Sequence, residues 1–309
     1  MKAIRIHEFG GPDVLELEDI AIPQPGEDEV LIKVYASSVN PVDQKIFEGK
    51  AQEKFPTQFP LTMGWDVSGV VEQAGNKVRN FSIGDEVYGR PFPTTNGAFA
   101  EYLVIKANQI SLKPKSIDHL NAAAVPLAGL TAWQGLFKHG QLQHGQTVLI
   151  HAASGGVGSF AVQFAKWKGA KVIGTASAEN LSFIKQLGAD EAIDYKNERF
   201  EDKVKDVDLV FDLIGGDTQK RSLQVLKEGG RLITTVMPSH QQEAKEKHIH
   251  LEAFMAQSYP EDLEQIADLI DDGIVSPVIS SIINLEDAKK AEILSEKGHP
   301  RGKIVIKVV

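Results

Sequence analysis

Small residues at a fixed spacing follow an apolar segment at 147–150, and they are the first candidates for a binding function. Ala153, Gly155 and Gly158 stand at the spacing of the dinucleotide-binding fingerprint, with alanine in place of its first glycine. Small side chains there let the turn close and let backbone N–H groups approach a pyrophosphate. The pattern predicts a dinucleotide site made by Ala153, Ser154, Gly155, Gly156, Val157 and Gly158. The alternative is a purely structural turn between a strand and a helix.

The residues after this loop predict the helix that such a site needs. One apolar stripe has the spacing i, i+3, i+4, i+7 and i+8, and consists of Val157, Phe160, Ala161, Phe164 and Ala165. The N-terminus of this helix would face the glycines, where its partial positive charge favours an anion.

The next apolar segments bear on the choice of coenzyme. KVIGTAS ends at Ser177, close to where NAD-binding proteins place an acid that holds the ribose 2′-hydroxyl. A serine hydroxyl can instead donate to a 2′-phosphate, so the segment predicts NADP(H). Glu179 follows two residues later and is interpreted as an acid in the first turn of a helix. Gly215 and Gly216 end a further strand, where they either approach a ligand or simply turn the chain.

Composition narrows the classes of function. The chain has 309 residues, of which 42% are hydrophobic and 24% charged, which predicts about two ordinary globular domains. A formal charge of −9 argues against binding to nucleic acid. The chain has no cysteine, which excludes disulfides, thiolate metal sites and a cysteine nucleophile. No signal peptide and no apolar run near the roughly 18 residues of a membrane span are present, so a soluble, cytoplasmic protein is expected.

The order of segments predicts an α/β fold with two parts. Residues 29–39 and 65–75 are β-rich, as is most of the first third. From about residue 120, helices alternate with short apolar strands, which predicts a doubly wound parallel sheet with helices on both faces. The last segment, 302–309, alternates Ile304, Ile306 and Val308 and is expected to return to the first domain as a strand.

Motifs along the whole chain resemble the medium-chain dehydrogenase/reductase superfamily, in its zinc-free quinone oxidoreductase and enone reductase branch. They are SVNPVDQKIFEG, MGWDVSGVV, GDEVYG, GAFAEY, LAGLTAWQGL, HAASGGVG, LGAD, FDLIGG and RGKIVIKV, together with the opening 34 residues. The resemblance implies a GroES-like, partly open β-barrel domain at 1–122 and 274–309, and a Rossmann domain at 123–273. It also implies NADPH and substrate in a cleft between them, and a homodimer or homotetramer.

The same resemblance bears on zinc. In the zinc alcohol dehydrogenases of this superfamily, a histidine in a GHE motif and a cysteine bind the catalytic metal. The matching triplet here is Gly64, Trp65 and Asp66, and the cysteines are absent, so no metal is expected. The pair His248 and His250 is interpreted as part of a solvated polar segment, and His151 as structural.

The resemblance further implies roles for single residues. It places the segment of Asn40 and Lys45 beside the nicotinamide, where the two side chains are candidate donors to a developing oxyanion. It also places Thr131 near the nicotinamide and Tyr195 at the 2′-phosphate. The alternative is local, because Asn40, Pro41 and Asp43 also form a good helix start, which would leave Lys45 an ordinary exposed lysine.

The expected function is NADPH-dependent hydride transfer to a quinone or to the C=C bond of an α,β-unsaturated carbonyl. An enoyl-thioester reductase is one alternative, and an NADPH-binding sensor or partner protein with incidental catalysis is another. Trp65, Tyr88 and Phe92 either line an apolar substrate pocket or belong to the core.

Overall fold

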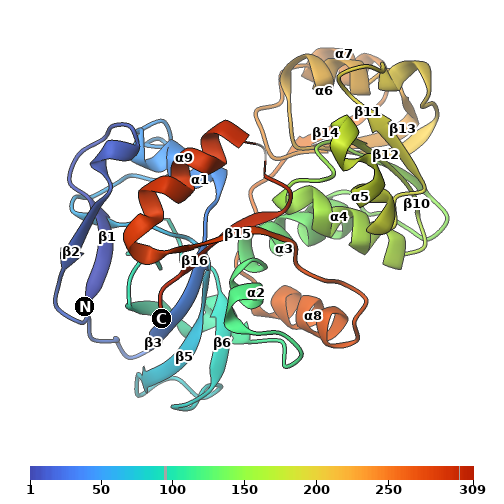
Figure 1. Cartoon of the computed structure of the whole chain (residues 1–309). Coiled ribbons are helices and arrows are strands. Elements are labelled where there is room, and N and C mark those ends of the chain that lie inside the picture. The colour runs from blue at the N-terminus through green and yellow to red at the C-terminus, as the bar shows by residue number, and fades with distance from the viewer. Residues whose placement is uncertain (94–95, 299) are drawn as a thin grey trace. The chain divides into compact units, whose positions relative to one another are not determined.

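The structure is a computed structural model that describes residues 1–93, 96–298 and 300–309. The chain forms two compact units (Figure 1). The first comprises Met1–Leu127, Ser258–Gly273 and Pro277–Val309, and the second comprises Ala128–Gln257 and Ile274–Ser276. Within the described residues, no helix combines the length and apolar character needed to cross a bilayer.

The first unit is mostly β. Its larger sheet has the order β15-β16-β3-β5-β6-β8, with β7 also paired to β3, and its smaller sheet has the order β2-β1-β4. The strands are β1 (Lys2–Ile6), β2 (Glu16–Asp19), β3 (Glu29–Ser38), β4 (Leu61–Thr62), β5 (Val67–Ala74), β6 (Glu86–Gly89), β7 (Tyr102–Lys106), β8 (Ile110–Leu112), β15 (Ile279–Asn284) and β16 (Lys303–Lys307). This matches the predicted GroES-like part of the fold.

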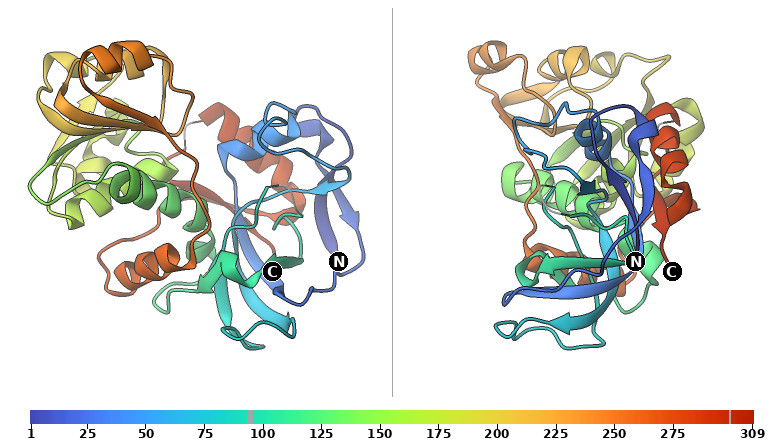
Figure 2. Two further views of the ribbon diagram at one scale, coloured as in Figure 1. Left: turned by 180° about the vertical axis from the view of Figure 1, so that it is seen from behind. Right: turned by 90° about the vertical axis from the view of Figure 1, so that its left-hand side faces the viewer.

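The C-terminal strand returns to the first unit, as predicted. β16 pairs antiparallel with β3, so that Val305 lies opposite Ser38, and both chain termini lie on this unit (Figure 2). Ile304 and Ile306 are buried on one side and Val305 on the other. Both sides are covered because the helices α2 (His119–Ala123) and α9 (Ala288–Gly298) each pack against β16.

Two further helices complete the first unit. They are α1 (Pro41–Phe47) and α8 (Pro260–Asp271). The expected boundary at residue 273 assigned α8 to the second domain, and the structure differs there. α8 packs against β8, and the Tyr88 hydroxyl donates to the Leu263 carbonyl at 2.5 Å. Its apolar stripe was visible in the sequence, but periodicity does not reveal which sheet covers it.

The second unit is a parallel sheet of the doubly wound type, as predicted. Its strand order is β11-β10-β9-β12-β13-β14, which is the 3-2-1-4-5-6 order of dinucleotide-binding folds. Helices α4 and α5 lie on one face, and α6 and α7 on the other (Figure 1). The strands are β9 (Thr147–Ile150), β10 (Lys171–Ala176), β11 (Glu191–Asp194), β12 (Val207–Asp212), β13 (Leu226–Thr234) and β14 (His250–Ala253). The helices are α4 (Gly156–Trp167), α5 (Leu181–Gln186), α6 (Gly216–Ser222) and α7 (Gln241–Glu246).

One helix crosses the boundary between the units in sequence. α3 (Pro126–Trp133) begins in the first unit and continues into a wider, π-helical segment at Gln134–His139. The sequence did not indicate this change of helical type.

Candidate functional site

The turn between β9 and α4 is shaped by close backbone contacts. A Cβ atom at Gly158 would lie 2.2 Å from the Ala152 carbonyl oxygen and 2.7 Å from the Ala153 Cα, so only glycine fits. Ala152 itself has a φ of 50°, a conformation that non-glycine residues adopt rarely and mostly at functional turns.

The structure explains why the first glycine of the fingerprint is an alanine. Ala153 is fully buried, and its N–H donates to the Thr175 carbonyl on β10 at 2.9 Å. A Cβ at Gly174, in the same strand, would lie 2.9 Å from the Ala153 Cβ. Gly174 therefore leaves the space that the Ala153 methyl group occupies, a compensation that the sequence interpretation missed.

The N-terminus of α4 is open for an anion. Gly155 is the N-cap residue and has no side chain to cap the helix. In the described part of the chain, no hydrogen bond from the amides of Gly156, Val157 or Gly158 is found. These amides and the dipole of a twelve-residue helix suit the pyrophosphate of a dinucleotide. The residues present thus fit the coenzyme that the sequence predicted.

The end of β12 is organised by Asp212, which the sequence interpretation did not single out. Its Oδ1 accepts hydrogen bonds from the amides of Ile214 and Gly215, both at 2.9 Å, and its Oδ2 accepts from Gln219 at 3.0 Å and Thr234 at 3.1 Å. Gly215 takes a φ of 80° that favours glycine. The Gly215 turn therefore lies at the carboxyl edge of the sheet, where ligands of such sheets bind.

The end of β10 differs from the expectation. Ser177 is buried, and its hydroxyl donates to Glu179 Oε1 at 2.7 Å. The sequence interpretation left the strand end without a carboxylate, but the side chain of Glu179 folds back and supplies one. Beyond β11, the Tyr195 ring is half exposed, and Lys196 Nζ lies 6.0 Å from its centroid.

Two other predicted residues of the second unit are largely enclosed. Thr131 lies on α3 with 8% of its surface exposed. His151 is fully buried, with Nδ1 3.1 Å from Thr175 Oγ1 and Nε2 2.9 Å from Ser222 Oγ. Burial lowers the pKa of His151 to about 4, so the ring is neutral at pH 7. These contacts support the structural interpretation of His151.

The first unit contains a buried polar cluster, which we call the Asp66 cluster: Ser38, Asn40, Asp43, Asp66, Glu292 and Lys303. At its centre, Asp66 Oδ2 accepts hydrogen bonds from Ser38 Oγ at 2.6 Å and Asn40 Nδ2 at 2.7 Å. Lys303 Nζ lies 3.3 Å from the same oxygen, and Asp66 Oδ1 accepts from the Leu127 amide at 2.7 Å. The Asp66 charge is fully buried and both of its oxygens are satisfied.

Both polar atoms of the Asn40 side chain are hydrogen-bonded within this cluster. Its amide nitrogen donates to the Ser38 carbonyl and to Asp66, and its amide oxygen accepts from Lys303. An amide has only two hydrogens to donate, and both are used here. Asn40 is therefore arranged to position its segment rather than to donate to a substrate oxygen.

Lys45 projects from the helix that the cluster anchors. α1 begins as the local interpretation predicted, with Asn40 as N-cap, Pro41 in its first turn, and the Asn40 N–H donating to Asp43 Oδ2 at 2.6 Å. Lys45 lies in the last turn of α1 and is exposed. The Lys45 ammonium group is therefore exposed, and it is carried by a helix whose first turn is held by the Asp66 cluster.

Two carboxyls of the Asp66 cluster are short of partners. Within residues 1–93, 96–298 and 300–309, no hydrogen bond is found for the buried atoms Asp43 Oδ1 and Glu292 Oε1. Burial raises the pKa of Asp43 to about 8, and burial together with the Asp43 charge raises the pKa of Glu292 well above its ordinary value. Asp43 is therefore mainly protonated at neutral pH, and burial favours the neutral form of Glu292 as well.

Comparisons with known proteins agree with this geometry. The family model for the alcohol dehydrogenase GroES-like domain matches residues 26–115, and the model described as zinc-binding dehydrogenase matches 187–306. The NADPH-dependent alkenal/one oxidoreductase of Arabidopsis thaliana is 37% identical over 99% of this chain and 79% of its own length. The mouse quinone oxidoreductase is 35% identical over 94% of this chain and 92% of its own length. The chain belongs to the medium-chain dehydrogenase/reductase superfamily.

Solved structures of the superfamily are similar over the whole chain. The quinone oxidoreductase from Coxiella burnetii has a TM-score of 0.93 and 38% identity, and covers 100% of this chain and 99% of its own. The Escherichia coli quinone oxidoreductase, solved in complex with NADPH, has a TM-score of 0.90 and 26% identity, with full coverage of both chains.

Trp65, which the family resemblance matches to a zinc-binding histidine, is part of the core. Trp65 is fully buried in an apolar cluster, and a Cβ at Gly64 would lie 2.4 Å from the Phe99 ring. Tyr88 is also fully buried, whereas Phe92 is 36% exposed and packs edge-on against Phe55. Trp65 and Tyr88 are therefore core residues rather than an open pocket wall.

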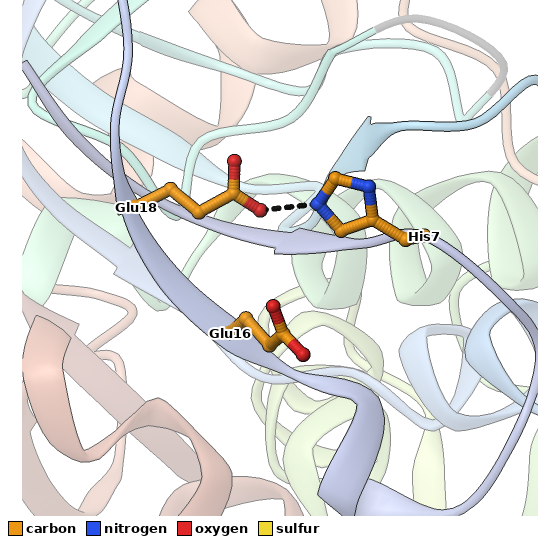
Figure 3. Close-up of side chains that lie close together, drawn as sticks. All are labelled: His7, Glu16 and Glu18. Atoms are coloured by element: carbon orange, nitrogen blue, oxygen red, sulfur yellow. Dashed lines mark hydrogen bonds and ion pairs between the residues drawn. The ribbon is translucent and has the colours of Figure 1, made fainter.

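Other histidines are engaged in surface pairs. His248 lies 3.4 Å from Glu228, and His250 lies 3.0 Å from Glu252. A cluster of possible metal-ligating side chains, His7, Glu16 and Glu18, lies on the β1–β2 hairpin. There His7 Nε2 lies 2.5 Å from Glu18 Oε1 (Figure 3). Arg5 holds the other oxygen of Glu18 at 3.2 Å, so that carboxylate already has cationic and hydrogen-bonding partners.

Proposed function

We propose that this protein is an NADPH-dependent reductase that transfers a hydride to a quinone or to the C=C bond of an α,β-unsaturated carbonyl. The observation that carries the proposal is the near full-length similarity to oxidoreductases of these two names, in a chain whose α4 N-terminus suits a pyrophosphate. NADPH, when bound, supplies the hydride.

The protein's own groups have separate tasks in this proposal. The amides of Gly156, Val157 and Gly158 bind the pyrophosphate, and the Gly215 turn lines the same edge of the sheet. Lys45 donates a hydrogen bond to the carbonyl oxygen on which negative charge develops, and this lowers the barrier. Asn40 holds the start of α1, and water supplies the proton that completes the reduction.

We propose that no metal ion takes part. At the position of the zinc ligand, the chain offers the indole of Trp65, which is not a metal ligand, and the neighbouring Asp66 carboxylate is committed to the Asp66 cluster. Oligomerisation as a homodimer or homotetramer and a cytoplasmic location are further parts of the proposal. They rest on the family resemblance and on composition alone.

A substrate panel tests the proposal. NADPH oxidation would be measured with quinones, enones, enoyl thioesters and simple ketones, with and without EDTA. Turnover with quinones or enones that EDTA does not reduce is expected. Turnover confined to enoyl thioesters would identify a thioester reductase. NADPH binding without turnover on any of these compounds would identify a sensor or partner protein.

A further inference from the structure

Opposite charges at the ends of β10 and β11 bear on which nicotinamide coenzyme the protein accepts. We propose that Glu179 and Lys196 act as opposing specificity determinants, so that the protein uses NADH as well as NADPH and Glu179 limits its preference for NADPH. This inference rests on the proposed function, because it requires that the coenzyme binds at this edge of the sheet.

The position of Glu179 supports the first half of the inference. In doubly wound sheets of this order, the adenosine ribose lies at the end of the second strand, which is β10 here. Proteins that prefer NAD(H) hold an acid there for the ribose 2′-hydroxyl. Glu179 reaches this place because its Oε1 accepts the Ser177 hydroxyl at 2.7 Å, and that bond also uses the one hydrogen Ser177 has to donate.

The charge state of Glu179 is defined by its neighbours. The Ser177 hydrogen bond holds the pKa of Glu179 below its ordinary value, and the positive charge of Lys196 acts in the same direction. Glu179 is therefore ionised at neutral pH. A 2′-phosphate placed beside it would meet like charge, whereas a 2′-hydroxyl would find an acceptor.

Lys196 supplies the opposing charge. It follows Tyr195 directly after β11, and its backbone N–H donates to Asp194 Oδ1 at 3.1 Å, which fixes the loop. Its ammonium group lies over the Tyr195 ring and beside an open groove of about 550 Å³. The charged residues that line this groove are of both signs: Lys196, Arg199, Lys220 and Arg221, with Glu198, Glu201 and Asp217. A 2′-phosphate on this side is attracted by Lys196, so neither coenzyme is strongly excluded.

Three variants measure the two contributions separately. Kd values for NADPH and NADH would be determined by coenzyme fluorescence, and 2′,5′-ADP would be compared with ADP as a competitor, at low and high salt. For the unmodified protein we expect the two coenzyme Kd values within about tenfold of each other. Glu179→Gln keeps an acceptor for Ser177 and is expected to raise the preference for NADPH by about tenfold, and Lys196→Gln to lower it by about tenfold. The variant that carries both substitutions is expected to have a ratio of NADPH and NADH Kd values near that of the unmodified protein.

Matched controls change the same charges elsewhere. Lys185→Gln on α5 and Glu261→Gln on α8 alter exposed residues outside the turns that directly follow β10 and β11. Both are expected to leave the ratio of the two coenzyme Kd values within about twofold of that of the unmodified protein. A ratio that Glu179→Gln leaves unchanged, or a preference for NADPH above a thousandfold in the unmodified protein, overturns the inference and leaves the proposed function intact. Failure to bind either coenzyme overturns both.

Discussion

Lys303 Nζ lies 3.3 Å from Asp66 Oδ2, and the two side chains are 5% and 0% exposed. This ion pair joins the last strand of the chain to the segment that precedes β5, and it is surrounded by further hydrogen bonds to Asn40 and the Val39 carbonyl. A buried pair of this kind is costly to break, because the remaining charge then has no partner and no water.

We expect Lys303→Met to destabilise the protein by about 3–5 kcal/mol, since it leaves the Asp66 carboxylate uncompensated. Urea unfolding followed by tryptophan fluorescence measures the change. The double variant Lys303→Met with Asp66→Asn removes both charges and should recover much of the loss. Equal destabilisation by Lys303→Met and by Lys307→Met, which changes an exposed residue of the same strand, would contradict this account.

Replacing Lys45 tests the proposed donor. Lys45→Ala should lower turnover with an enone by roughly 10- to 1,000-fold, the scale of losing one oxyanion donor, while the Kd for NADPH changes little. Steady-state kinetics with fluorescence titration of NADPH separate the two quantities. Lys50→Ala, an exposed lysine three residues beyond α1, is the control and should keep full turnover. Undiminished turnover of Lys45→Ala would remove this residue from the mechanism.

Gly155 and Gly158, at the turn between β9 and α4, should respond differently to the same substitution. A Cβ at Gly158 would lie 2.2 Å from a carbonyl oxygen, whereas the nearest atom to a Cβ at Gly155 lies at 3.4 Å. Gly158→Ala is therefore expected to cost about 2 kcal/mol or more and to weaken NADPH binding, and Gly155→Ala to cost less than about 1 kcal/mol. Thermal unfolding compares the variants. Similar losses for both would refute the steric argument.

How far the sequence predicts this protein depends on the range of the interactions. The parallel sheet was predictable because each strand and helix has its own local pattern, and the order of these patterns along the chain implies the doubly wound topology. The shape of the turn between β9 and α4 was predictable for the same reason, since the whole fingerprint lies within a dozen residues.

The parts that escaped prediction depend on tertiary contacts or on the choice of a side-chain rotamer. Lys303 is 263 residues from Asn40 in the chain, and only the pairing of β16 with β3 brings them together. The fold-back of Glu179 onto Ser177 depends on a side-chain rotamer, and the compensation of Ala153 by Gly174 depends on two neighbouring strands. The first and third relations have no local signature in the sequence, and the neighbouring positions of Ser177 and Glu179 do not by themselves determine the rotamer of Glu179.

His151 should make the protein sensitive to acid. Its pKa in the folded state is about 4, below the ordinary value of 6.5, so the unfolded chain binds its proton first as pH falls. The free energy of unfolding is therefore expected to decrease between pH 6.5 and 4, with a contribution of about 3 kcal/mol from this residue. Urea unfolding at several pH values should show a smaller decrease for His151→Gln. An unchanged pH dependence would be inconsistent with a neutral buried ring.

Asp43 should have the opposite effect on the pH dependence of stability, lowering the free energy of unfolding as pH rises. Its carboxyl keeps its proton up to about pH 8 when folded but loses it near pH 4 when unfolded, so stability falls as pH rises through this window. Asp43→Asn cannot ionise and still offers an acceptor for the Asn40 N–H. Calorimetry from pH 5 to 8.5 should show that the stability of the variant increases relative to that of the unmodified protein as pH rises. A constant difference across this range would contradict the protonated state.

The placement of β16 has a consequence for biosynthesis. During translation, residues 128–257 leave the ribosome as a contiguous stretch and can collapse at once, whereas residues 36–38 of β3 must wait until β16 emerges. Until then residues 36–38 at the end of β3 lack their β16 partner, and unpaired strand backbone is a hazard for aggregation. This end of β3 is therefore open to wrong pairing in the nascent chain until β16 pairs with it.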